Sequence, residues 1–209
     1  MAEIKIAADS GGGSVGLVGP STTTGNAALQ LKLPVADGSA NQLLKTDGSG
    51  NLGWSTGNGY VSYALIVDKK NADTDGGTFT SGAWRTRDLN TILVNEDSIC
   101  AGTSGNDSFT LIAGTYLIKW SAPAYEVQHH TTKLHDETAD AIIAKGTPAY
   151  DQSGYSMGRS WGSHVVTITS NNDYKIKHKC STTRNTDGLG LGANLQDEYY
   201  TIVEVWRYA

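Results

Sequence analysis

The stretch Tyr199–Tyr208 constrains the fold of this 209-residue chain more than any other. It is rich in β-branched and aromatic residues and holds no Gly or Pro, which predicts a long β-strand. Because successive side chains of a strand point to opposite faces, its apolar residues lie on both faces. One face holds Tyr199, Val203 and Val205, and the other holds Tyr200, Ile202, Trp206 and Tyr208. Both faces must then be covered, one by a second sheet and the other by a neighbouring subunit.

From position 60 onward the chain consists of short apolar runs separated by turn residues. The first run, Tyr60–Val67, is a predicted strand that stops at the polar loop Asp68–Gly77. Strict alternation over Tyr174–Cys180 predicts a half-buried antiparallel strand, with lysines on its outer face. Pro123 is expected to bend its strand or to lie at a sheet edge. About ten such strands and no convincing helix predict an all-β antiparallel sandwich or jelly roll.

The first 59 residues differ in composition from the rest. Trp54 is the only one of the 17 aromatic residues in this segment, which also holds 12 of the 25 glycines. So little apolar bulk does not fold alone, and the segment is expected to lie along a larger assembly or along copies of itself. We expect an attachment arm over residues 1–27, a stalk over residues 28–59 and a globular head over residues 60–209; for the stalk, a disordered linker is the alternative. The residues expected to anchor the arm are Ile4, Ile6, Val15, Leu17 and Val18.

Charge and hydropathy exclude several classes of protein. A net charge of −5 argues against a nucleic-acid binder, which would carry a basic patch. No run of 18 apolar residues exists to insert into a membrane, and the N-terminus has no apolar signal core, so synthesis in the cytoplasm is expected. Cys100 and Cys180 are too few for a disulfide framework and are expected to be buried thiols, which leaves open whether they are neighbours in space.

No catalytic motif is present. The chain contains no Gly-x-Ser-x-Gly, Walker loop or His-Glu-x-x-His sequence. A glycan-cutting enzyme would need two carboxylates placed across a bond, and the candidates show no telling arrangement. These candidates are Glu126, Asp136, Glu137 and Asp140. We therefore expect a protein that is not an enzyme and has no cofactor.

The histidines and one acidic loop are candidate metal ligands. His129 and His130 point to opposite faces of a strand, so within one subunit they do not share an ion. A ring of identical histidines on a symmetry axis is the alternative, and His178 lies close to Cys180 along one face. The loop Asn71–Gly76 lacks the spacing and closing Glu of an EF-hand, although such a loop could still hold calcium. Hydrogen-bonded structural histidines and no metal site are expected.

One segment has the composition of a recognition surface. Pro148–Ser163 is predicted to be a loop in which aromatic and basic residues are set among Gly and Ser. Its candidate ligand-binding residues are Tyr150, Tyr155, Arg159 and Trp161. Aromatic rings of this kind also stack on sugars, so a glycan is the expected ligand. The alternative is that Tyr155 and Trp161 pack back onto the sandwich.

Three segments together resemble the C1q/TNF-like jelly-roll heads of structural proteins in bacterial viruses. They are Thr78–Asn90, Leu111–Tyr116 and Tyr199–Trp206. The stretch Leu31–Leu52 resembles the segment that precedes such heads in phage tail fibres, so the resemblance covers residues 28–209. It implies a homotrimer in which the first and last strands of the head face the threefold axis. The implied interface residues are Tyr63, Leu65, Tyr200, Ile202 and Trp206.

The resemblance also implies a function. We expect a non-enzymatic virion structural protein, made in the host cytoplasm and carried on the virion. Its N-terminal arm would bind other phage virion proteins, and its trimeric head would adhere to the host surface, with a host-surface glycan as the ligand. The alternative is a capsid decoration protein that stabilises the virus head. Three copies per trimer and many trimers per particle would strengthen weak single contacts through avidity.

Overall fold

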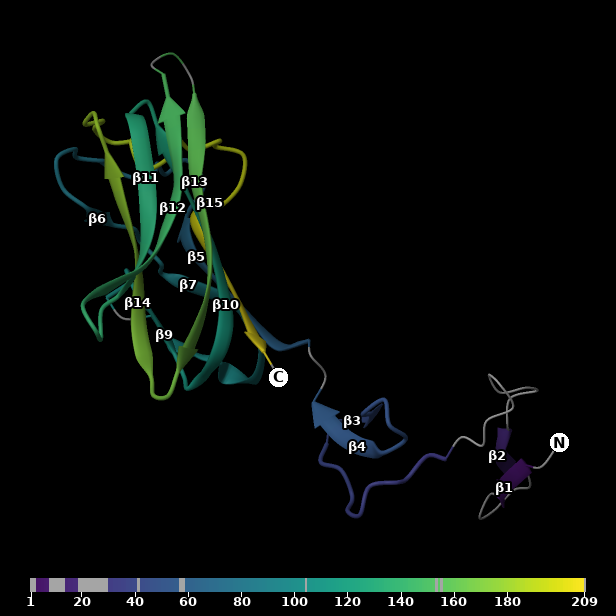
Figure 1. Ribbon diagram of the computed structural model, residues 1–209. Coiled ribbons are helices and arrows are strands. Elements are labelled where there is room, and N and C mark those ends of the chain that lie inside the picture. The colour runs from purple at the N-terminus through teal and green to yellow at the C-terminus, as the bar shows by residue number, and fades with distance from the viewer. Residues whose placement is uncertain are drawn as a thin grey trace. The chain divides into compact units, whose positions relative to one another are not determined.

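The computed structural model describes residues 3–7, 14–18, 30–40, 42–56, 59–103, 105–152, 154 and 156–208. The chain divides into two compact units, residues 1–57 and 58–209. The described part of the first unit contains two antiparallel hairpins (Figure 1). One pairs β1 (Glu3–Ala7) with β2 (Ser14–Val18), and the other pairs β3 (Gln42–Thr46) with β4 (Leu52–Thr56). We call residues 58–209 the sandwich.

The turn between β3 and β4 follows from the sequence Asp47-Gly48-Ser49-Gly50-Asn51. Asp47 Oδ1 accepts hydrogen bonds from the backbone N–H groups of Ser49, at 2.7 Å, and Asn51, at 3.1 Å. Gly48 and Gly50 have φ angles of 80° and 92°, which residues other than glycine rarely adopt. The residue types of this short stretch therefore account for the turn.

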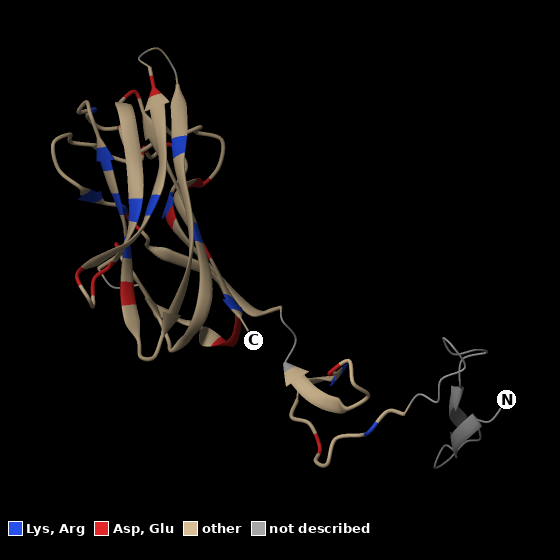
Figure 2. Cartoon of the chain, in the orientation of Figure 1, with Lys and Arg blue, Asp and Glu red and all other residues tan. Residues whose placement is uncertain are grey.

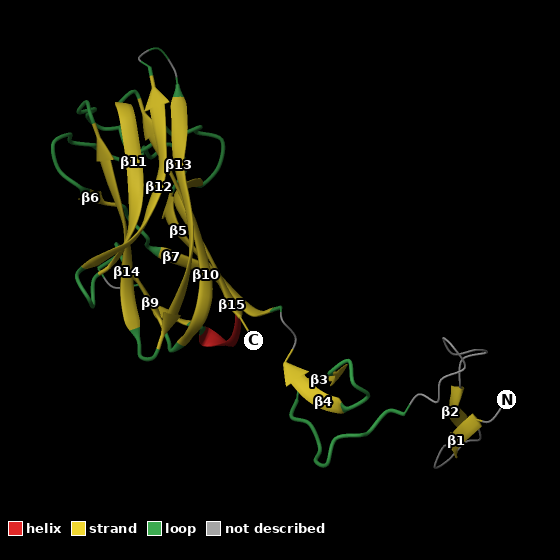
Figure 3. Cartoon of the chain, in the orientation of Figure 1, coloured by secondary structure: helices red, strands yellow, loops and turns green. Residues whose placement is uncertain are grey.

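The sandwich consists of two antiparallel sheets, and strands make up almost all of its regular structure (Figure 3). The five-stranded sheet has the order β13 (Met157–Ile168), β10 (Gly114–Tyr125), β15 (Glu198–Tyr208), β5 (Tyr60–Lys70) and β7 (Thr91–Asn95). The six-stranded sheet has the order β12 (Ala141–Asp151), β11 (Gln128–Asp136), β14 (Asn172–Cys180), β9 (Phe109–Leu111) and β8 (Cys100–Gly102), with β6 (Arg85–Thr86) paired to β14. Neighbours in each sheet are mostly distant in sequence, as in a jelly roll. The all-β antiparallel prediction is confirmed.

Strand β14 shows how the residue pattern sets the fold. Tyr174, Ile176, His178 and Cys180 are buried, and the lysines between them face outward. This is the alternation of a strand whose one face packs on a second sheet. The predicted half-buried strand is therefore confirmed.

The sandwich contains two separate clusters of buried apolar residues. The larger, which we call the main core, lies between the two sheets and includes Trp120, Ile176, Val203 and Cys100. The smaller, which we call the end core, consists of Phe79, Ala124, Val127 and Cys180, with Leu189 packed against them. Each core holds one of the two cysteines, and both thiols are buried and free. The prediction of buried thiols is confirmed, and the two belong to different clusters.

The closing strand β15 lies inside the five-stranded sheet, between β10 and β5. Val203 and Val205 are fully buried in the main core, while Ile202 and Trp206 are half-buried on the opposite face. The strand is therefore apolar on both faces, as predicted. At its start, however, the register with β5 shifts between Tyr199 and Ile202. Tyr200, beside this irregularity, is buried, because Thr74 and Gly190 of its own chain lie against it.

The segment Pro148–Ser163 was wrongly predicted to be a loop. Most of it belongs to β12 and β13, so Tyr150, Arg159 and Trp161 lie on strands, while Tyr155 lies outside the described residues. The glycines that suggested a loop have a packing reason. A Cβ at Gly162 would lie 1.9 Å from the Trp120 ring, so the strand needs glycine there.

The strand that contains Pro123 continues to Tyr125. Pro123 is paired with Arg159 of β13, but β10 is paired with β15 only from Tyr116 to Ser121. Proline has no N–H to donate, and it lies where one side of the strand has no ladder partner. The prediction that Pro123 lies at an edge is correct in this local sense.

Candidate functional site

The face of the five-stranded sheet that points away from the main core combines half-exposed apolar side chains with a few charges. We call it the outer face. Strand pairing places Trp206 opposite Tyr63 and Leu117, and Glu204 opposite Leu65 and Lys119. Residues directly opposite each other share a face of the sheet. On β13 the outer-face residues are Arg159, Trp161, Ser163 and Val165.

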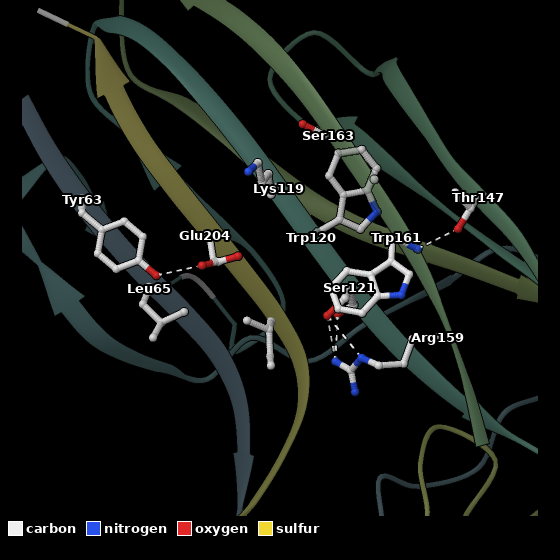
Figure 4. A pocket seen from close by; sticks show the side chains of 12 residues that line it. Tyr63, Leu65, Lys119, Trp120, Ser121, Thr147, Arg159, Trp161, Ser163 and Glu204 are labelled. Atoms are coloured by element: carbon white, nitrogen blue, oxygen red, sulfur yellow. Dashed lines mark hydrogen bonds between the residues drawn. The ribbon is translucent and has the colours of Figure 1, made fainter. Parts of the chain in front are cut away.

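A groove of about 670 Å³ runs across this face (Figure 4). Its lining comes from four strands of the sheet and from Thr147 of β12. The side chains that shape it are Tyr63, Leu65, Lys119, Ser121, Arg159, Trp161, Ile202 and Glu204. The indole of Trp161 is 56% exposed, which for so large a ring is a substantial uncovered apolar surface. The groove is therefore apolar, with charged groups at particular positions.

Aromatic rings cluster at the end of β5 and β15. Tyr60 lies 4.9 Å from Tyr208 and 6.1 Å from Trp206 between ring centroids, and Tyr63 lies 5.2 Å from Trp206. The Lys119 ammonium lies 4.9 Å from the Trp206 ring centroid, within cation–π range. We call these four rings the aromatic corner.

The polar groups of the groove are largely engaged within the chain. The Tyr63 hydroxyl donates to Glu204 Oε1 at 3.2 Å, and burial together with the Glu204 charge raises the pKa of Tyr63 to about 12. Arg159 donates to Ser121 Oγ at 2.9 Å and to the Tyr200 carbonyl at 2.6 Å. Burial lowers the pKa of Arg159. These bonds fix the two side chains in place and leave the apolar surface between them uncovered.

The structure joins two sites that the sequence suggested separately. Of the predicted interface residues, Tyr63, Leu65, Ile202 and Trp206 lie on the outer face, partly exposed. Of the predicted ligand-binding residues, Arg159 and Trp161 line the same groove. Trp161 does not pack into the core of its own chain, which contradicts the packing alternative for this residue.

Tyr200 is the exception among the predicted interface residues. It is only 3% exposed, and its hydroxyl donates to the Thr74 carbonyl at 2.8 Å. Its ring lies so close to Gly190 that a Cβ there would be 2.2 Å from the ring. Residues Thr74 and Gly190 of its own chain therefore cover Tyr200, so it offers no surface to a neighbouring subunit.

Tyr150 lies on the other sheet, away from the residues with which it was grouped. It is 55% exposed, and its ring centroid is 4.7 Å from that of His129 on the neighbouring strand β11.

Sequence analysis missed Lys119, Glu204 and Thr147 as groove residues. The only signal for Lys119 is its position between Ile118 and Trp120, whose side chains fill the main core.

The histidines lie as the strand pattern predicted. His129 is exposed and His130 is 3% exposed, so the two point to opposite faces of β11. Within the ranges that the structure describes, no group of three or more His, Cys, Asp or Glu side chains is arranged to hold a metal ion.

No helix in the described ranges is long and apolar enough to cross a membrane. Lys and Arg are interspersed with Asp and Glu along the described chain (Figure 2).

The predicted anchor residues lie on the β1–β2 hairpin. Ile4 is paired with Leu17, and Ile6 with Val15, while Val18 is opposite Glu3. The apolar positions of the two strands therefore meet in register. Their role in attachment stays a prediction.

Comparison with known proteins gave structural likenesses only. No family model and no curated protein matches the chain. Similar solved structures include murine APRIL (8% identity, TM-score 0.46, 70% of this chain and 98% of that one) and the globular domain of the zebrafish complement 1qA protein (12%, 0.40, 71% and 96%). Another is the PRD1 vertex protein P5 (11%, 0.42, 72% and 99%). The jelly-roll assignment rests on the strand pairing described above.

Proposed function

We propose that the protein is a non-enzymatic structural subunit that assembles into a homotrimer through the outer face of its five-stranded sheet. The observation that carries this proposal is the uncovered apolar surface of β15, β5 and β13 around the groove. Contiguous apolar surface with a polar rim is typical of protein interfaces. At about 25 cal/mol per Å² of apolar area, covering it stabilises an assembly by several kcal/mol.

The shape of the outer face suits a ring of copies. It carries the groove, which reaches Trp161 and Arg159, and the aromatic corner, which shares only Tyr63 with the groove and otherwise presents different side chains. In a heterologous contact one surface of a copy meets the other surface of the next, and a threefold rotation closes such a ring. Three copies also agree with the symmetry that the sequence resemblance implies.

The finer proposal is a phage virion appendage for host-surface adhesion. Residues 1–27 would attach the trimer to other virion proteins, residues 28–59 would act as the stalk, and the head would contact a host-surface glycan. The trimer would cover Trp161, so the exposed pair Tyr150 and His129 becomes the better candidate for stacking on a sugar. A capsid decoration protein would use the same trimer. Antibody labelling of particles distinguishes the two, because signal at the tail tip supports adhesion and signal over the whole capsid supports decoration.

The assembly proposal is tested by the mass of the purified protein in solution. Light scattering at micromolar concentration is expected to give about three times 22.1 kDa. Ile202→Asp places a charge on the outer face, where a neighbouring copy would strip its water, and is expected to dissociate the trimer. Ile142→Asp is the matched control, because Ile142 is 53% exposed on the other sheet. A monomeric wild type, or equal effects of the two variants, would overturn the proposal.

A further inference from the structure

A chain of buried polar groups crosses the sandwich beside the end core. Asp151 at the end of β12 faces His130 of β11, with Oδ2 and Nε2 2.6 Å apart. His130 Nδ1 lies 2.9 Å from His178 Nε2 on β14. The three residues are 1%, 3% and 0% exposed, so water does not reach them. Nothing in the proposed assembly uses these groups.

The hydrogen bond between the two imidazoles constrains their protonation. Asp151 Oδ1 accepts a backbone hydrogen bond from Gly158, while its Oδ2 only contacts His130 Nε2, without an aligned hydrogen bond. The hydrogen bond between His130 Nδ1 and His178 Nε2 needs one donor and one acceptor, so both rings can be neutral. His178 Nδ1, like the facing atoms His130 Nε2 and Asp151 Oδ2, has no hydrogen-bond partner among the described residues. Each imidazole carries one proton in this arrangement, and both are neutral.

A permanent positive charge lies beside the two histidines. Arg87 is fully buried and donates to Thr201 Oγ1, at 2.8 Å, and to the carbonyls of Leu189, at 2.7 Å, and Pro123, at 3.3 Å. Burial lowers the pKa of Arg87 to about 10, so it stays charged at neutral pH. The carboxylates of Asp68 and Asp88 and the guanidinium of Arg159 also act on Arg87.

One further proton on His178 would place a buried charge beside Arg87, and its new N–H would find no acceptor among the described residues. A further proton on His130 would face Asp151, which opposes the cost of burial. Burial, and then the charges of Arg87 and His130, hold the pKa of His178 well below its usual 6.5. Burial also lowers the pKa of His130, against the opposing effect of Asp151. Protonation of either residue therefore favours an open state in which water reaches it.

The same groups hold the loops that cover the end core. The ring of His178 packs on Phe79, with centroids 4.7 Å apart. Residues 77–84 and 181–190, which we call the end loops, are joined by backbone hydrogen bonds between Phe79 and Arg184, at 2.9 and 3.0 Å. Arg87 ties the second end loop through the Leu189 carbonyl. Loss of the packed His178 would remove the support beneath both loops.

We propose that His130 and His178 form an acid-sensitive latch, in which proton uptake from solvent opens the end loops while the main core stays closed. The histidines are neutral in the closed state and free to take protons in the open state. The closed state is therefore fully favoured above about pH 6.5 and is lost as the pH falls below it. Each histidine raises the opening equilibrium constant by up to about tenfold per pH unit in that range. Asp68 opposes this trend weakly, because burial raises its pKa.

The two cysteines give the latch an internal readout. Cys180 lies in the end core and Cys100 in the main core, and they are 4% and 2% exposed. The full-length protein is treated with 4,4′-dithiodipyridine, which takes up each exposed thiol as a mixed disulfide and releases thiopyridone. The ratio of the Cys180 rate to the Cys100 rate is expected to rise at least about tenfold from about pH 7 to about pH 5.5. A ratio that stays constant would overturn the latch.

Variants assign the response to the histidines. His178→Gln keeps a donor toward His130 but does not titrate, and it is expected to reduce the rise in the ratio about tenfold. His164→Gln, which replaces an exposed histidine on β13, is the matched control and is expected to keep the wild-type response. A full response in His178→Gln contradicts the proposal. If that variant does not fold, NMR titration of the wild-type imidazoles decides instead, and midpoints near 6.5 for both His130 and His178 would overturn it.

Discussion

The main core and the end core are built on different principles, although one pair of sheets forms both. The main core consists of apolar side chains. A few of its aromatic rings also make a hydrogen bond, as the indole N–H of Trp120 does. The end core has only four buried apolar residues and borders Arg87, His130 and His178. Apolar burial stabilises a fold at any pH, whereas a buried polar chain does so only in one protonation state. We infer that the main core maintains the fold at any pH, whereas the end core keeps one end of the sandwich closed only while its histidines are neutral.

The largest effect is expected from Trp120→Ala in the main core. Trp120 is 1% exposed, packs over Gly162 and donates to Thr132 Oγ1 at 2.8 Å. Removing the ring leaves a cavity and takes one of its two hydrogen-bond partners from Thr132 Oγ1, which keeps Ser160 Oγ, and the unfolding free energy should fall by about 3–5 kcal/mol. Urea denaturation followed by circular dichroism measures this. A loss below about 1 kcal/mol would mean that the main core does not hold the fold.

Arg87→Met is expected to have the next largest effect, at the end core. The change leaves three acceptors without their donor and removes the positive charge that the carboxylates of Asp68 and Asp88 act on, which costs about 3 kcal/mol. Lys69→Met is the matched control, because its ion pair with Asp197 is at the surface, with side chains 35% and 48% exposed. That change should cost much less, because solvent screens the pair. Equal losses in denaturation experiments would contradict the distinction between buried and surface charge.

Glu137→Gln separates surface carboxylates from the buried histidines by pH. Hydrogen bonds from Lys177 and then Lys175 lower the pKa of Glu137 to about 2, against burial. A lowered folded-state pKa contributes stability above the usual value of 4.5, and this is lost as the pH falls toward 2. After screening by solvent, the variant should lose about 1 kcal/mol at neutral pH and nothing near pH 2. If the difference in unfolding free energy between the variant and the wild type instead changes between about pH 7 and 5.5, the pH range of Glu137 overlaps that of the histidines.

The smallest effect on folding is expected from Trp161→Ala, which touches neither core. The exposed indole should contribute less than about 0.5 kcal/mol to the folding of one chain. Association is where its loss should appear, as a weaker trimer in sedimentation or light scattering against concentration. An unchanged trimer together with lost binding to host cells would instead assign the groove to a ligand.

Local patterns predicted much of the fold. The alternation in Tyr174–Cys180 and the two-sided apolar strand β15 both appear in the structure, because each depends on neighbours within a few residues. The segment Pro148–Ser163 was mispredicted because side chains that are distant in sequence require its glycines. Gly162 is required by Trp120, which lies on another strand.

The sequence by itself determined the fold class and the need to cover β15 on both faces, since strand alternation and apolar content are local properties. Only the tertiary structure decided which residues share the outer face, because strand order and register bring β13 and β5 onto one sheet. It also buried Tyr200 beneath Thr74 and Gly190, which come from two loops. The contact of His130 with His178 arises in the same way, from the pairing of β11 with β14 at His130 and Cys180. Chemistry between residues far apart in the chain is set by packing, and a linear pattern does not encode it.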